Sequence, residues 1–155
     1  MKEKKTLTKE ETKEKALRLL EFRSHSEHEL REKLRAAGGL EEDIDEAVNF
    51  CLEYNFLNDR QYAGMRARDL SSLKKFGKRR IKSELYRRGL SEEDIEEALS
   101  DIEDDEDELM RLVEKKLRGN FDKKNKGKTI RYFLYRGYEL SDIKNAIERL
   151  MTDEI

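Results

Sequence analysis

The chain has 155 residues, of which 45% are charged and 35% are apolar, and it contains no proline. Its 34 Lys and Arg residues nearly balance 36 Asp and Glu residues, so the formal net charge is only −2. High charge with low hydropathy leads to disorder where a large net charge repels the chain, and the balance here excludes that class. Because proline breaks helices, its absence favours a nearly all-helical protein.

Export and membrane insertion are not expected. No segment approaches the ~18 consecutive apolar residues that mark a membrane span, and residues 1–6 lack the apolar core of a signal peptide. Cys51 is the single cysteine, so we expect a reduced thiol packed on an apolar helical face. The sequence therefore predicts a cytoplasmic protein with no membrane partner.

A repeat of about 50 residues occurs three times, centred on Gly38, Gly89 and Gly137. Each glycine has a large apolar residue four positions before it, isoleucine six positions after it and alanine nine positions after it. In the three copies these residues are Leu34, Ile44 and Ala47, then Leu85, Ile95 and Ala98, then Phe133, Ile143 and Ala146.

After an N-terminal tail of mixed charge over residues 1–12, the first repeat is expected over residues 13–56. Its three helices are predicted from helical apolar spacing and from Ser26 as an N-cap. The predicted apolar faces carry Leu17, Leu20 and Phe22, then Leu30 and Leu34, then Ile44, Ala47, Val48, Cys51 and Leu52.

The second repeat is expected over residues 57–103. Asn58 caps its first helix, a break follows at Phe76-Gly77, Gly89 ends the second helix in a left-handed conformation, and residues 91–94 resemble a capping box. The apolar positions are Tyr62, Ala63, Ala67, Leu70 and Leu73, then Ile81 and Leu85, then Ile95, Ala98, Leu99 and Ile102.

The third repeat is expected over residues 104–155, with a long basic loop at residues 122–128 and a middle helix shorter than that of the second repeat. Its apolar positions are Leu109, Leu112, Val113 and Leu117, then Ile130, Phe133 and Leu134, then Ile143, Ala146, Ile147 and Leu150. No segment shows sustained β alternation. The predicted fold is all-α, with three tandem three-helix repeats forming an elongated, curved, solenoid-like chain.

The charge is segregated along the sequence. Residues 74–88 carry eight bases and one acid, residues 92–108 carry twelve acids and no base, and residues 111–131 carry nine bases and two acids. Bases together with exposed tyrosines can bind phosphates and stack on nucleobases. The alternative is a solvated surface that balances the acidic helices through weak ion pairs.

Helical geometry predicts which bases point outward. With Ile81 and Leu85 buried, Arg80, Ser83 and Arg87 lie on the opposite face of their helix, and the third repeat presents Lys128, Arg131 and Tyr135 in the same register. The equivalent positions of the first repeat are not basic. The predicted partner- and nucleic-acid-binding residues are Lys74, Lys75, Lys78, Arg79, Arg80, Arg87, Arg88, Lys124, Lys126, Lys128, Arg131, Tyr135 and Arg136.

Other classes of function find little support. A DNA-reading helix-turn-helix would place its second helix in the major groove, but the corresponding element here is acidic. His25 and His28 are the only histidines and lack a set of metal ligands, and no phosphate-binding glycine loop occurs. We therefore expect no catalysis, no metal and no cofactor.

Three segments, in order and at matching spacing, resemble one family. Residues 23–30 (RSHSEHEL) resemble its Arg-Ser-x-Ser-x-x-Glu-Leu segment, and residues 57–63 (LNDRQYA) its Leu-Asn-Asp-x-x-Tyr-Ala signature. Residues 77–85 (GKRRIKSEL), followed by Gly89-Leu90, resemble its Gly-x-x-x-Ile-x-x-Glu-Leu segment. This is the RecX family of bacterial regulators of the RecA recombinase, and the resemblance covers nearly the whole chain.

The resemblance implies a non-enzymatic monomer that binds the groove of the RecA–single-stranded-DNA filament, with weak binding to duplex DNA. It also implies inhibition of strand exchange, ATP hydrolysis and co-protease activity, and hence a role in recombination and the SOS response. Two alternatives remain. One is a stand-alone nucleic-acid-binding repeat protein, and the other is a scaffold that docks its acidic helices on a basic partner.

Overall fold

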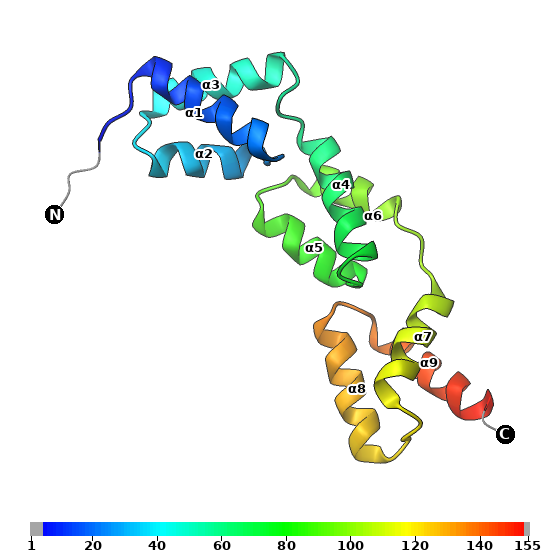
Figure 1. Cartoon of the computed structure of the whole chain (residues 1–155). Helices are drawn as coiled ribbons and strands as arrows, with labels where there is room; N and C mark the ends of the chain where they lie inside the picture. The colour runs from blue at the N-terminus through cyan, green and yellow to red at the C-terminus, as the bar shows by residue number, and fades with distance from the viewer. Residues whose placement is uncertain (1–4, 154–155) are drawn as a thin grey trace. The chain divides into compact units, whose positions relative to one another are not determined.

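A computed structural model describes residues 5–153, and these form nine α-helices and no strand (Figure 1). The all-α class is therefore confirmed. The helices are α1 (Lys9–Phe22), α2 (Glu27–Ala36), α3 (Glu41–Glu53), α4 (Asp59–Ser72), α5 (Lys78–Arg87), α6 (Glu92–Ser100), α7 (Glu106–Leu117), α8 (Lys123–Tyr135) and α9 (Leu140–Asp153). None of these helices is long and apolar enough to cross a membrane.

Side-chain caps start the helices where the sequence places them. The Ser26 hydroxyl accepts a hydrogen bond from the Glu29 amide at 3.1 Å and forms a full capping box with that residue. Asn58 accepts from the Gln61 amide at 3.1 Å, and Ser91 from the Asp94 amide at 3.1 Å. Each cap satisfies a backbone donor that the first helical turn leaves unpaired.

Two helix starts differ from expectation. Thr8 forms a capping box with Glu11, so residues 9–12, which the sequence places in a tail, belong to α1. Asp122 accepts from the Asn125 amide at 2.8 Å, so the basic segment 122–128 is not a loop but the first turns of α8. Consequently α8 has 13 residues against 10 in α5, and the third repeat has the longer middle helix, not the shorter one.

The left-handed helix end predicted at Gly89 is confirmed, and the other two repeat glycines adopt the same conformation. Gly38, Gly89 and Gly137 have φ angles of +105°, +74° and +100°, and each is the second residue after the end of a middle helix. A left-handed residue at this position ends a helix because it turns the next carbonyls and amides away from the helix axis. The 50-residue repeat is thus a repeat of backbone conformation as well as of sequence.

The chain divides into two compact units. The first runs to Arg66 and resumes over Leu85–Ala98; the second covers Ala67–Glu84 and continues from Leu99. The helices of the middle repeat are therefore shared between the units, and each unit contains the junction between two successive repeats. The elongated, curved arrangement of the repeats stays a prediction.

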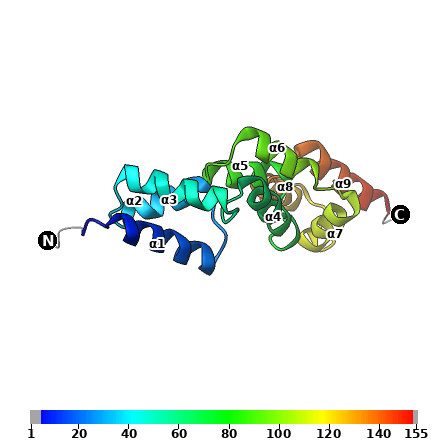
Figure 2. The same cartoon turned by 90° about the horizontal axis from the view of Figure 1, so that it is seen from above.

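The first unit has its core among α1, α2 and α3, which lie side by side in Figures 1 and 2 and contact one another. The buried cluster consists of Ala16, Leu30, Leu34, Ile44, Ala47, Val48, Cys51 and Leu57. Cys51 is free and fully buried, which confirms a packed thiol, and this burial raises the pKa of the thiol. Phe22 was expected in the α1 face but is 86% exposed, because α1 ends at this residue.

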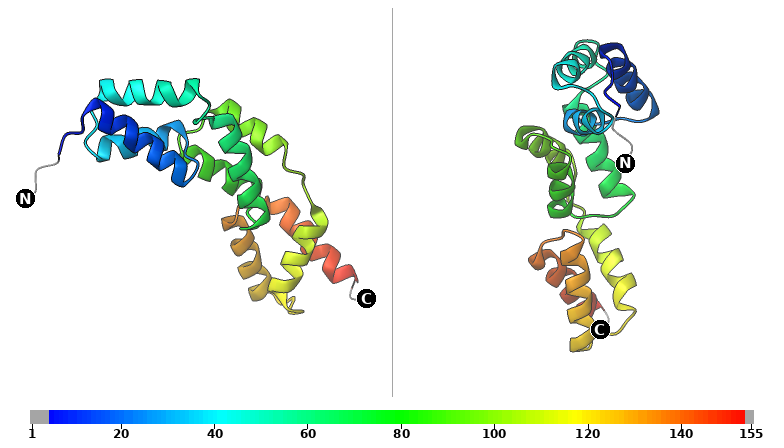
Figure 3. Two further views of the ribbon diagram at one scale, coloured as in Figure 1. Left: turned by 45° about the horizontal axis from the view of Figure 1, so that its top comes forward. Right: turned by 90° about the vertical axis from the view of Figure 1, so that its left-hand side faces the viewer.

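The second unit has its core among α7, α8 and α9, which lie together in both views of Figure 3. The buried cluster consists of Leu109, Val113, Leu117, Phe133, Ile143, Ala146, Ile147 and Leu150. Leu73 was expected to extend the apolar stripe of α4. It is 75% exposed instead, because α4 ends at Ser72.

Candidate nucleic-acid interface

Backbone hydrogen bonds in the second unit join the segment 74–77 to the turn between α8 and α9. The Gly77 amide donates to the Arg136 carbonyl at 2.8 Å, and the Arg79 amide donates to the Gly137 carbonyl at 3.2 Å. The Tyr138 hydroxyl donates to the Lys75 carbonyl at 2.8 Å. The amino-terminal amides of α5 thus meet the carboxyl-terminal carbonyls of α8, which aligns the two helix dipoles favourably.

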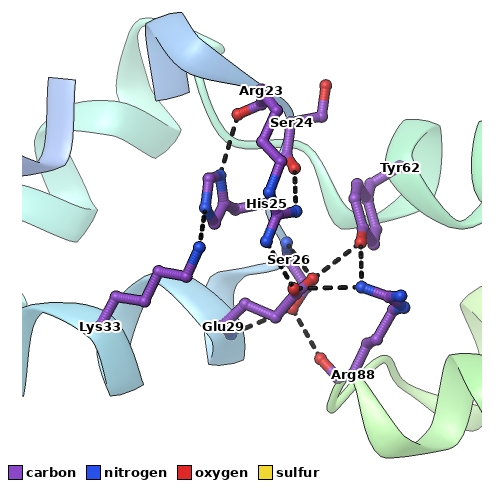
Figure 4. Close-up of polar contacts among 8 residues, drawn as sticks. All are labelled: Arg23, Ser24, His25, Ser26, Glu29, Lys33, Tyr62 and Arg88. Atoms are coloured by element: carbon purple, nitrogen blue, oxygen red, sulfur yellow. Dashed lines mark hydrogen bonds and ion pairs between the residues drawn. The ribbon is translucent and has the colours of Figure 1, made fainter. Parts of the chain in front are cut away.

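An equivalent junction lies in the first unit (Figure 4). The Ser26 hydroxyl at the start of α2 donates to the Arg88 carbonyl at the end of α5, at 2.6 Å. The Glu29 carboxylate accepts from the Tyr62 hydroxyl at 2.8 Å and from the Arg88 guanidinium at 3.2 Å. The pKa of Glu29 is lowered, because these bonds and the neighbouring positive charges outweigh burial, which acts to raise it. Arg88, predicted as a partner- or nucleic-acid-binding residue, is therefore a structural residue of this junction.

Substituting Arg88 tests this structural role. Arg88→Met removes the guanidinium that bonds both Glu29 and Tyr62, and the Glu29 carboxylate, only 15% exposed, keeps Arg23 at 3.6 Å as its cationic partner. We expect a loss of about 2 kcal/mol in the free energy of unfolding, since hydrogen bonds to charged groups contribute ~1.5–3 kcal/mol. Lys82→Met, at an exposed position of α5, should change it by less than about 0.5 kcal/mol. Equal effects in urea denaturation would contradict the assignment.

His25 is 2% exposed and links the Lys33 ammonium to the Arg23 backbone carbonyl in the same junction (Figure 4). Its Nε2 lies 2.9 Å from the Lys33 ammonium, and its Nδ1 lies 2.9 Å from the Arg23 carbonyl. An ammonium can only donate, so Nε2 accepts and Nδ1 carries the single proton. Burial, followed by the charges of Arg23 and Lys33, lowers the pKa of His25. The junction therefore requires the neutral ring.

This geometry predicts a pH dependence of stability. Because the pKa is lower in the folded chain, the unfolded chain binds a proton first, so stability should fall as the pH drops below about 6.5. His25→Gln should flatten the profile between about pH 6.5 and 5. His28→Gln, at an exposed histidine paired with Glu32, should keep the slope. Urea denaturation at several pH values measures both, and a slope surviving in His25→Gln would contradict the prediction.

A basic groove of about 990 Å³ lies between α7 and α8 in the second unit. None of its lining side chains is acidic. The lining residues are Lys75, Leu112, Lys115, Lys116, Leu117, Arg118, Asn120, Asn125, Lys128, Thr129, Arg131, Tyr132, Phe133, Tyr135 and Arg136. Seven of these are bases, so the groove concentrates positive charge and attracts anionic ligands.

Five of the thirteen predicted interface residues line the groove: Lys75, Lys128, Arg131, Tyr135 and Arg136. The others lie outside its lining. In the same unit Lys78 pairs with Asp104 and Arg79 pairs with Glu139, while Lys74, Lys124 and Lys126 lie along the segment before α5 and the first turns of α8. Arg87 and Arg88 belong to the first unit.

Three groove bases were missing from the predicted set: Lys115, Lys116 and Arg118. They belong to the basic block that the sequence shows, but they lie near the end of the first helix of the repeat. The apolar stripe of α7 contained a usable signal: with Val113 and Leu117 buried, the bases Lys115, Lys116 and Arg118 lie on the exposed side of the helix.

Arginine–aromatic contacts hold the end of the groove nearest α5. The Arg80 guanidinium lies 4.8 Å from the Phe76 ring and 4.9 Å from the Tyr135 ring. The Arg136 guanidinium lies 5.0 Å from the Phe76 ring and 5.5 Å from the Tyr132 ring. Arg80 was predicted to face outward. The structure instead places it between two rings and beside Glu84, at 3.1 Å, so it supports the groove.

The bases of the groove differ in whether a carboxylate of the chain forms an ion pair with them. Lys75 pairs with Glu108 at 2.9 Å, and hydrogen bonds from Arg111 and Lys75 lower the pKa of Glu108. Among residues 5–153, no carboxylate forms an ion pair with Lys115, Lys128 or Arg131. These three cations can therefore bind phosphates without first breaking an internal salt bridge.

A second, acidic cleft of about 470 Å³ lies between α7 and α9 in the same unit. Its carboxylates are Asp104, Asp105, Glu106, Asp142 and Glu148. The two signs of charge therefore occupy different sides of α7. Of these two clefts, only the basic groove attracts a polyanion. The acidic cleft repels nucleic acid and so opposes non-specific binding of nucleic acid over the surface of the second unit.

Comparison with known proteins places this arrangement in one family. The family models for the first, second and third three-helix domains of RecX match residues 13–51, 58–99 and 103–147. The chain is 40% identical to "Regulatory protein RecX" of Vibrio parahaemolyticus over 88% of this chain and 89% of that protein. It is 37% identical to "Regulatory protein RecX" of Clostridium perfringens over 90% of this chain and 68% of that protein.

A solved structure supports the same family. The crystal structure of RecX from Lactobacillus salivarius superposes with a TM-score of 0.83 and 25% sequence identity, covering 95% of this chain and 97% of that chain. The resemblance predicted from three short segments is thus confirmed, and so are the three three-helix domains. With all three domains matched in order and relatives at up to 40% identity, the chain belongs to the RecX family of regulatory proteins.

Proposed function

We propose that this protein binds the RecA–single-stranded-DNA filament and inhibits recombinase, ATPase and co-protease activity, without catalysing a reaction itself. The observation that carries the proposal is the basic groove between α7 and α8, which has seven bases and no carboxylate in its lining. In a member of a family named for regulation, such a groove fits a polyanionic ligand better than a small metabolite.

Several weak contacts would supply the affinity. Each exposed cation contributes modestly on its own, but contacts linked through one chain act at high effective concentration on a repetitive partner. A filament offers the same surface at every protomer. A family of helical repeats is suited to such a ligand, because successive domains can contact successive protomers.

The test is ATP hydrolysis by RecA on single-stranded DNA, measured with increasing amounts of this protein. We expect inhibition that saturates and that weakens as salt rises, because phosphate contacts are salt-dependent. Binding of the protein to the filament is measured in parallel by co-sedimentation. Unchanged ATP hydrolysis at a concentration that saturates this binding would reject the proposal.

A second candidate is a stand-alone nucleic-acid-binding protein. The same groove favours it, because nothing in the lining requires a protein partner. This candidate predicts tight binding to bare DNA and no effect on RecA beyond competition for the strand. Excess free DNA separates the two: inhibition by competition is relieved by added DNA in proportion to its amount, whereas binding to the filament is not.

A further inference from the structure

Tyr135 differs from the other aromatic residues of the groove. Its side chain is 74% exposed at the end of α8, yet the Arg80 guanidinium lies 4.9 Å from its ring. Arg80 is itself fixed by Phe76 and by Glu84. The ring is therefore held in place on one side while most of its surface faces solvent.

The ring of Tyr132, one turn earlier in α8, is already in contact with other side chains of the chain. The Lys116 ammonium lies 4.2 Å from its ring, the Arg136 guanidinium lies 5.5 Å away, and the side chain is 39% exposed. The edge of Tyr132 also packs against Phe133, with 5.0 Å between ring centres. Of the two tyrosines that line the groove, Tyr135 is the one with a ring available to a ligand.

We propose that Tyr135 stacks on a nucleobase of a single strand whose phosphates are bound by Lys128 and Arg131. The inference rests on the proposed function and deepens it, since it names the DNA strand, and not the recombinase, as the ligand of the groove. The structure assigns Arg80 the role of a positioning residue that holds the Tyr135 ring.

The spacing along α8 fits this ligand. Lys128, Arg131 and Tyr135 follow one another at three and four residues, so they share one face of the helix. At 1.5 Å per residue they span about 10 Å, which corresponds to roughly three phosphates of a stacked strand at 3.4 Å. Stacking on Tyr135 requires an unpaired base, because both faces of a base inside a duplex are covered by its neighbours.

Fluorescence anisotropy without recombinase tests the inference. The probes are labelled oligothymidine, an abasic strand of the same length and a duplex. Tyr135→Ala should weaken oligothymidine binding by about 5- to 150-fold, from ~1–3 kcal/mol per stacked base. It should change binding to the abasic strand and the duplex by less than about twofold.

Two variants serve as controls. Tyr135→Phe keeps the ring and should retain affinity, and Tyr86→Ala removes an equally exposed tyrosine, 72% exposed, on α5 outside the groove. Arg80→Met should produce a smaller loss, on oligothymidine only. This pattern distinguishes a positioning residue from a phosphate contact, which would affect all three probes.

The outcomes separate this inference from the proposed function. No binding of oligothymidine, no loss in Tyr135→Ala, or the same loss on the abasic strand each overturns stacking. If stacking fails while wild-type protein still inhibits ATP hydrolysis, the filament proposal stands. If oligothymidine binding behaves as expected but ATP hydrolysis is unchanged, stacking stands and the filament proposal is rejected.

Discussion

Reversing two charges of the basic groove, with Lys128→Glu and Arg131→Glu in one variant, should abolish inhibition of RecA ATP hydrolysis. Both side chains are exposed on α8 and line the groove. Each reversal replaces attraction to a phosphate by repulsion, and a unit charge about 4 Å away contributes ~1 kcal/mol even in water. The four units of charge change amount to about 3–4 kcal/mol, which is at least about 100-fold in affinity.

The matched control changes the net charge by the same amount elsewhere. Arg18 in α1 and Lys144 in α9 are exposed and lie outside the groove lining. Arg18→Glu with Lys144→Glu should leave inhibition within about twofold of wild type, apart from the long-range effect of net charge, which 0.15 M salt screens beyond ~8 Å. Equal losses in the two variants would show that net charge, and not the groove, drives binding. Circular dichroism should show unchanged helix content in both.

Replacing Gly137 by alanine should destabilise the second unit strongly. The residue has a φ angle of +100°, and an added Cβ would lie 2.3 Å from the Arg80 amide nitrogen and 2.4 Å from the Arg80 Cβ. The junction between α5 and the α8–α9 turn must open to accept it, which also breaks the bond from the Arg79 amide to the Gly137 carbonyl. Backbone strain and overpacking together should cost about 3 kcal/mol or more.

The same substitution at Gly119 distinguishes the cost of backbone strain from the cost of overpacking. It has a φ angle of +72°, but an added Cβ meets nothing within 4 Å. Gly119→Ala should therefore cost only the left-handed strain, about 1 kcal/mol. In thermal unfolding followed by circular dichroism, we expect a decrease in Tm of about 10 °C for Gly137→Ala and about 3 °C for Gly119→Ala. Equal decreases would show that close packing at Gly137 contributes nothing.

Local chemistry explains why much of the fold follows from the sequence. The caps at Ser26, Asn58 and Ser91 and the left-handed helix ends depend on residues within a few positions of each other, so short patterns predict them. Buried positions such as Leu34 and Ile44 follow from helical spacing. The errors fall near helix ends. Phe22 and Leu73 carry the right pattern but lie where the helix stops, and Leu52 and Leu134, the second-last residues of α3 and α8, are 43% and 37% exposed.

The candidate site followed from the sequence only in part. The charges along the sequence indicated two basic blocks, and the alignment of the three repeats on their glycines predicted the exposed face of α8. The sequence could not show that Arg88 pairs with Glu29, which lies 59 residues away along the chain. Arg80 has one partner at helical spacing, Glu84, but its contact with Tyr135 joins residues that are 55 positions apart. For the same reason the sequence could not bring Lys75 on the segment before α5, Lys115 on α7 and Arg131 on α8 to one groove.

By itself, then, the sequence determined the helical class, the caps at Ser26, Asn58 and Ser91, the threefold repeat and the family, because each depends on near neighbours or on motifs in fixed order. The tertiary structure decided which cations are engaged in junctions and which line a groove. Ion pairs and cation–π contacts act over a few ångströms between side chains distant in sequence, and only packing sets those distances. A base is available to an external anion where packing leaves its charge without an internal ion pair, as for Lys128 and Arg131 among residues 5–153.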